Sequence, residues 1–184
     1  MSYTFSRRDF MKYTALAAAA VAVSGSLTGC SNPNQPSGKI GETLSFGASD
    51  SIFGFGGSSD KHTLTSVTYT LGVLTCDIQH KPVGDSFSCG KDRYAIIVDY
   101  ENGDTKEFNS TSDGIEVSGT GDTAMDSGKT YPAQVTFKNI DFTGAKKVWF
   151  RYYPHYTAIE NKTDYMKDVR ATWDITSRVI AGRF

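Results

Sequence analysis

The chain of 184 residues carries 19 basic and 20 acidic side chains, and this formal net charge of −1 excludes the strongly basic surface of a nucleic-acid-binding protein. The sequence contains no haem, iron–sulfur or dinucleotide-binding motif, and no catalytic set of residues at a usable spacing. It therefore predicts a non-enzymatic protein without a cofactor.

A paired arginine stands near the start of the chain, in the segment SRRDFMK at Ser6–Lys12. The segment resembles the bacterial twin-arginine export signal, Ser/Thr-Arg-Arg-x-Phe-Leu-Lys, with methionine in the leucine position. The alanine-rich run at 14–23 has the length of a signal-peptide core and is shorter than the roughly 20 apolar residues that span a bilayer. The resemblance implies export directed by Arg7, Arg8 and Phe10; the alternative is a short surface helix.

The signal region ends in LTGC at Leu27–Cys30, which resembles the lipobox of bacterial lipoproteins. The resemblance implies that residues 1–29 are removed and that Cys30 carries acyl chains such as palmitate. More than one acyl chain gives stable anchoring, so we expect an extracytoplasmic, membrane-anchored protein. The alternative is an ordinary cleavage site with an incidental cysteine.

The region after the lipobox divides into a short polar segment and one domain. Residues 30–39 contain the stretch SNPNQPSGK with two prolines, which favours a flexible tether. Residues 40–184 are enough for a single domain with its own core.

This domain is rich in Thr, Tyr, Phe, Val and Gly, with short apolar runs separated by turn residues, a pattern typical of β-proteins. The predicted strands are Thr43–Phe46, Thr63–Leu74, Tyr94–Tyr100, Thr105–Asn109, Gly114–Val117, Ala133–Ile140, Lys147–Tyr153 and Ala171–Ile180. Eight short strands predict an all-β, two-sheet antiparallel sandwich of immunoglobulin-like type, with a β-barrel as the alternative. We expect at most one short helix, near 159–169.

The clearest turn signal is Asn102-Gly103, the favoured pair for a two-residue type I′ hairpin turn. That turn would set Glu101 directly opposite Asp104, and like charges at facing positions are unfavourable. This conflict favours a wider loop, with a weak cation site as the alternative.

Three segments together resemble the telokin-like immunoglobulin-fold domain of bacterial lipoproteins. They are IGETLSFG at the start of the domain, RYAIIVDYENGD in its middle and SGKTYPAQVTFKNIDFTGAKKVWFRYYP near its end. The resemblance covers about two thirds of residues 30–184 and implies a fold and a surface location rather than a reaction. Two cysteines, Cys76 and Cys89, are not part of the family pattern.

Those two cysteines flank the stretch DIQHKPVGDSFS. In an oxidising compartment a pair this close in sequence favours a disulfide, Cys76–Cys89, which the chain-entropy estimate credits with about 3 kcal/mol. Two buried thiols are one alternative. A metal site with His80 and either His62 or His155 is another, although the spacings match no known zinc module.

The stretch VWFRYYPHY gathers aromatic rings near the end of the domain. Strand periodicity places Trp149, Arg151 and Tyr153 on one face, followed by His155, and directs the intervening residues to the core. If exposed, this face offers contacts for a sugar ring or a protein partner; the alternative is that both faces are buried. The sequence therefore predicts a binding or structural module, or else an accessory subunit or enzyme of an exported redox system.

Overall fold

The computed structural model describes residues 35–45, 60–82, 87–121, 124–126, 128–154 and 170–180. All of them belong to the second of two compact units, which extends over Asn32–Phe184. No helix within these described ranges is long and apolar enough to cross a membrane.

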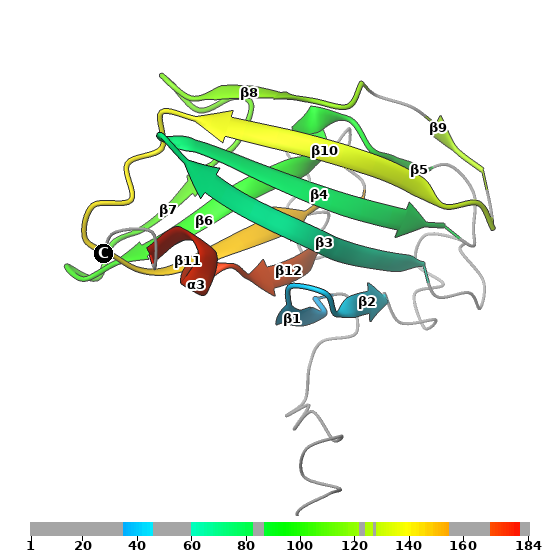
Figure 1. Cartoon of the computed structure of the whole chain (residues 1–184), viewed down its shortest axis with the longest axis horizontal. Helices are drawn as coiled ribbons and strands as arrows, with labels where there is room; N and C mark the ends of the chain where they lie inside the picture. Colours follow the sequence, from blue (N-terminus) through cyan, green and yellow to red (C-terminus); the bar gives the residue numbers. More distant parts are fainter. Residues whose placement is uncertain are drawn as a thin grey trace, which may run out of the picture. The chain divides into compact units, whose positions relative to one another are not determined.

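Two five-stranded sheets form the domain (Figure 1). The β11 sheet contains, in spatial order, β1 (Ser37–Lys39), β12 (Ala171–Asp174), β11 (Ala145–Tyr152), β6 (Tyr94–Tyr100) and β7 (Thr105–Phe108). The β10 sheet contains β2 (Thr43–Ser45), β3 (Lys61–Thr70), β4 (Val73–Lys81), β10 (Tyr131–Lys138) and β8 (Glu116–Gly119). The short strands β5 (Phe87–Ser88) and β9 (Ala124–Met125) pair separately, and the described helices are η2 (Lys91–Arg93) and α3 (Thr176–Ile180).

The core lies between the two sheets and follows from the alternation of side chains along their strands, which β-bulges interrupt in β3 and β11. Val148 and Phe150 of β11 are fully buried, as are Val135 and Phe137 of β10, and all four belong to one apolar cluster. Side chains of a strand point alternately to its two faces, so each strand contributes every second residue to this core. The predicted two-sheet sandwich is confirmed, and the barrel alternative is wrong, because no described strand belongs to both sheets.

One predicted strand, Thr63–Leu74, is instead a hairpin of two strands, β3 and β4. The chain reverses at Leu71 and Gly72, whose φ angles of 51° and 77° lie in the left-handed region. A two-residue turn with both residues in this region joins strands tightly, but leucine is rarely found there, so the sequence gives no ordinary turn signal. The strand β4 therefore continues to Lys81, well beyond the end of the predicted strand at Leu74.

Two predictions near the ends of the domain are also corrected. Ala171–Ile180 is not one strand: β12 ends at Asp174, whose carboxylate accepts a hydrogen bond from the N–H of Thr176 at 2.9 Å as α3 begins. Such a side-chain bond to the backbone two residues on favours a turn. Ser37–Lys39, expected in the tether, is the strand β1, paired in parallel with β12. The helix expected near 159–169 lies outside the described residues.

The β6–β7 hairpin has the wider loop that the charge conflict favoured. Its register sets Asp99 opposite Thr105, one residue away from that of a two-residue turn. The N–H of Tyr100 donates to the carbonyl of Asp104 at 2.8 Å, and Gly103 has a φ of 90° within the loop. This longer connection keeps the predicted strands and changes which side chains face one another.

Candidate functional site

A patch of polar and aromatic side chains lies on the outer face of the β11 sheet, directed away from the core. We define the outer-face patch by five residues: Trp149 and Arg151 of β11, Tyr153 just after it, Glu107 of β7 and Asn109 just after it. In the sheet register Trp149 lies opposite Ile97 of β6, and Ile97 lies opposite Glu107. The patch thus extends across three neighbouring strands.

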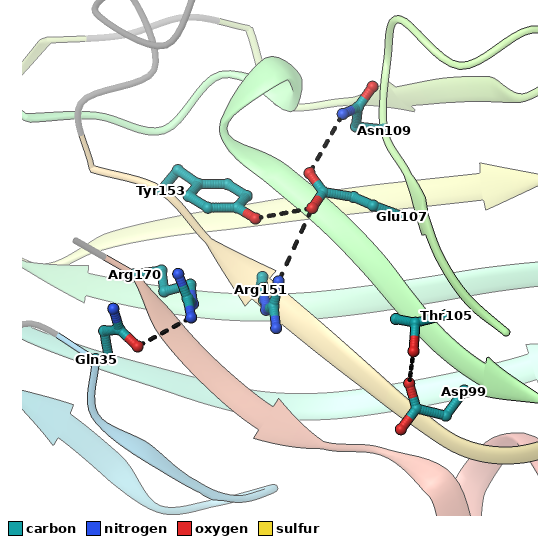
Figure 2. A network of polar contacts seen from close by, with 8 residues as sticks. All are labelled: Gln35, Asp99, Thr105, Glu107, Asn109, Arg151, Tyr153 and Arg170. Atoms are coloured by element: carbon teal, nitrogen blue, oxygen red, sulfur yellow. Dashed lines mark hydrogen bonds and ion pairs between the residues drawn. The ribbon is translucent and has the colours of Figure 1, made fainter. Parts of the chain in front are cut away.

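Glu107 is the centre of its polar contacts (Figure 2). One carboxylate oxygen accepts a hydrogen bond from the Tyr153 hydroxyl at 3.2 Å and lies 3.8 Å from Nη1 of Arg151. The other accepts a bond of 3.5 Å from the amide of Asn109. Burial raises the pKa of Tyr153, and the Glu107 carboxylate raises it further against the opposing effect of Arg151, so the phenol remains a hydrogen-bond donor.

Trp149 forms the apolar part of the patch and is partly exposed. Its ring packs against a small cluster made of Ala95, Ile97 and Tyr153, which are all buried. The ammonium group of Lys147 lies 5.8 Å from the centroid of the indole ring, within the range of a cation–π contact. The sequence therefore placed this face correctly, but Tyr153 is only 6% exposed and contributes through its hydroxyl rather than through an open ring.

Two further arginines border the patch, and sequence periodicity did not single them out. Arg93 is buried and donates from Nη1 to the carbonyl of Pro154 at 3.2 Å. Arg170, just before β12, donates to the side-chain oxygen of Gln35 at 2.9 Å, and Figure 2 shows it beside Arg151. The nearest signal in the sequence is that each arginine immediately precedes a strand of the β11 sheet, but strand order is not readable from the sequence.

Two of the three histidines lie inside the sandwich and form a pair. His62 of β3 and His80 of β4 occupy facing positions, and their Nδ1 atoms are 2.8 Å apart. Both rings pack against the ring of Tyr152, at centroid distances of 4.8 and 4.5 Å. The other nitrogen of His80 lies 2.8 Å from the hydroxyl of Tyr94, which donates to the carbonyl of Cys89 at 3.3 Å.

One arrangement of the protons satisfies all three contacts. Because the Tyr94 hydroxyl donates to a carbonyl, it accepts from Nε2–H of His80, and Nδ1 of His80 then accepts from Nδ1–H of His62. Burial lowers the pKa of His80 to about 3 and that of His62 well below its ordinary value, where His80 adds to the effect. The pair is therefore neutral at pH 7, and the hydrogen bond between His80 and Tyr94 of β6 connects the two sheets.

The predicted disulfide is absent from the structure, which has Cys76 and Cys89 as buried cysteines that are not bridged. Cys76 belongs to β4, where its side chain joins the core, and burial raises the pKa of its thiol above the usual range. Packing in the core favours the alternative of two buried thiols. No group of three or more His, Cys, Asp or Glu side chains in the described ranges is arranged to hold a metal ion.

A concave surface lies over the β10 sheet, beside the β-bulge between Leu64 and Ser66. It is a groove of about 650 Å³ whose lining includes the carboxylate-bearing residue Asp77. The two carboxylate oxygens of Asp77 accept hydrogen bonds from Ser66 and from the amide of Gln134. Because this carboxylate is already hydrogen-bonded within the fold, this groove is the weaker candidate for a ligand site.

Several predicted site residues lie outside the described part of the chain: Arg7, Arg8, Phe10, Cys30 and His155. Arg7, Arg8 and Phe10 nevertheless lie in a recognisable motif. Residues 4–24 match the family of TAT (twin-arginine translocation) pathway signal sequences. The chain is an exported protein.

Comparisons of the whole chain add little to this assignment. No curated protein matches it. Among solved structures the chain is similar to MPT63, a secreted protein from Mycobacterium tuberculosis whose crystal structure was determined at 1.5 Å resolution. The identity is 10% and the TM-score is 0.46, over 76% of this chain and 97% of that protein.

Proposed function

We propose that the protein is a lipoprotein, anchored to the membrane through Cys30, whose β-sandwich is a non-enzymatic binding module for an extracytoplasmic glycan. The export signal and the lipobox at Leu27–Cys30 support the location. The resemblance to telokin-like domains of bacterial lipoproteins supports a surface role without a reaction.

The observation that carries the binding function is the arrangement of Trp149 and Arg151 on the outer face of the β11 sheet. Both are partly exposed on one face of one strand. The hydrogen-bonding groups of Glu107, on the strand two positions away, and of Asn109, just after that strand, lie beside them. An aromatic ring flanked by a few fixed polar side chains is a common way to bind a small polar ligand. A protein partner is the alternative occupant of the same surface.

The anchor is tested by cell fractionation of the full chain. Cys30→Ser removes the thiol that would carry the acyl chains, so the protein should move from the membrane fraction to the soluble extracytoplasmic fraction. Metabolic labelling with a palmitate analogue should mark the parent chain and not the variant. Retention of the variant at the membrane would refute the anchor.

The binding function is tested by tryptophan fluorescence, because the chain has only two tryptophans and they lie in different surroundings. Trp173 is fully buried, whereas Trp149 is partly exposed, so a saccharide that stacks on the outer-face patch should change the emission of Trp149 alone. Trp149→Ala should lose both the signal and the binding to a panel of immobilised neutral and acidic oligosaccharides. Leu71→Ala, which truncates a 97% exposed side chain elsewhere, is the matched control. Unchanged binding by Trp149→Ala would refute the site.

A further inference from the structure

We propose that the outer-face patch recognises an acidic saccharide, with a sugar ring stacked on Trp149 and the carboxylate of that sugar or its neighbour bound by Arg151. The inference rests on the proposed function and makes it more specific, because it assigns the charge of the ligand and the residue that selects it.

The hydrogen-bond donors of Arg151 are the first reason. A guanidinium group carries five N–H donors and binds carboxylates best through two parallel hydrogen bonds. Here the side chain of Arg151 is only 24% exposed, and its one ion pair, to Glu107, is long at 3.8 Å. Its Nε is buried and has no hydrogen-bond partner among the described residues. Its other close acceptor is the hydroxyl of Tyr153, so the guanidinium group still has N–H donors for an added carboxylate.

The spacing along β11 is the second reason. Trp149 and Arg151 are two residues apart on one strand, so their side chains project from the same face about 6.6 Å apart. That separation suits a pyranose ring on the indole whose carboxyl group extends to the guanidinium. Arg170 precedes β12, the strand next to β11, and adds positive charge to this side of the sheet while it donates to Gln35 (Figure 2).

The third reason is that the fold already places a carboxylate, that of Glu107, beside Arg151. Glu107 faces Arg151 and accepts from the hydroxyl of Tyr153 and the amide of Asn109, so the patch is built to hold a carboxylate with donors on several sides. At 3.8 Å, however, Glu107 lies beyond hydrogen-bond distance of the guanidinium. A ligand carboxylate can therefore approach Arg151 more closely than the internal one does.

The test is a fluorescence titration of the whole mature protein. The probes are oligosaccharides of galacturonate, glucuronate and N-acetylneuraminate, each with its neutral methyl ester, and polyphosphate as an anion without a ring. We expect at least one acid to bind about tenfold or more tightly than its ester, which is the scale of a charge-assisted hydrogen bond. Its affinity should fall as the salt concentration rises.

Two variants assign the preference to its residues. Arg151→Gln should remove the difference between acid and ester without lowering the melting temperature, since it removes a poorly paired charge. Glu107→Gln should strengthen binding of the acid several-fold, because the competing internal carboxylate is gone. A purely structural role for Arg151 would instead lower the melting temperature of Arg151→Gln and leave the preference intact.

Each other outcome overturns a defined part of the inference. Equal binding of acids and esters would refute the charge selection and leave the glycan-binding function in place. Equal binding of polyphosphate would refute the contribution of the ring. Absence of binding to every oligosaccharide would refute the inference and the proposed function together.

Discussion

The buried histidine pair predicts a specific sensitivity to acid. In the unfolded chain a histidine takes up its proton near pH 6.5, whereas burial lowers the pKa of His80 in the folded protein to about 3. Between these two values the unfolded chain binds a proton that the folded protein excludes, so acid favours unfolding. The contribution of the neutral, buried His80 to the free energy of unfolding is fully present above pH 6.5 and is lost progressively as the pH falls toward 3.

The size of the effect follows from the same difference in pKa. At 1.36 kcal/mol per pH unit, His80 alone lowers the free energy of unfolding by about 2 kcal/mol at pH 5 and by about 4 kcal/mol at pH 3. For a domain of this size, a loss of about 2 kcal/mol lowers the melting temperature by roughly 4–8 °C. His62 adds to the loss in the same direction, since its pKa is also lowered by burial and by His80.

Urea denaturation of the mature protein at pH values from 7.5 to 4 measures this slope. The matched variant is His62→Leu combined with His80→Leu, because replacing both partners of a buried hydrogen bond with apolar groups of similar size can be nearly neutral. In this variant the stability between pH 6.5 and 5 should become nearly flat. Any slope left there belongs to other titratable groups of the chain. A flat profile of the parent protein, or an unchanged slope in the double variant, would refute the reasoning.

Three further predictions concern other parts of the fold. Leu71→Asn should raise the free energy of unfolding by about 1 kcal/mol, because asparagine tolerates the left-handed conformation that leucine adopts here at φ 51°; an unchanged melting temperature would contradict the turn. Cys76 and Cys89 should resist a thiol reagent in the native protein and react after unfolding, since both are buried; a mass increase of two protons on reduction of the exported protein would instead reveal a disulfide. Asp174→Ala should lower the free energy of unfolding by about 1 kcal/mol, because the N–H of Thr176 loses its acceptor, whereas Asp174→Asn should retain most of it.

The sequence by itself determined the fold class and the faces of the strands. Along β10 and much of β11 a period of two residues separates core from outer side chains, and this alternation depends only on the local geometry of an extended chain. Trp149 and Arg151 could therefore be placed on one outer face before any pairing was known. The export signal was equally readable, since a translocation receptor recognises it as a short linear segment.

The tertiary structure decided which side chains meet. His62 and His80 face each other because the chain turns at Leu71 and Gly72, a pair that carries no strong turn signal, and because the β-bulge between Leu64 and Ser66 then shifts the register by one residue. A shift of one residue in such a turn would move every later side chain to the opposite face.

The outer-face patch depends in the same way on pairing between distant segments. Glu107 comes within reach of Arg151 because β7 and β11 both flank β6, and Arg170 joins them from near the end of the described chain. Strand order is a property of the whole sheet, set by turns and by burial of the core, and no local pattern encodes it. The sequence thus determined the kinds of side chain available on this face, and only the fold decided that a carboxylate and two arginines lie together there.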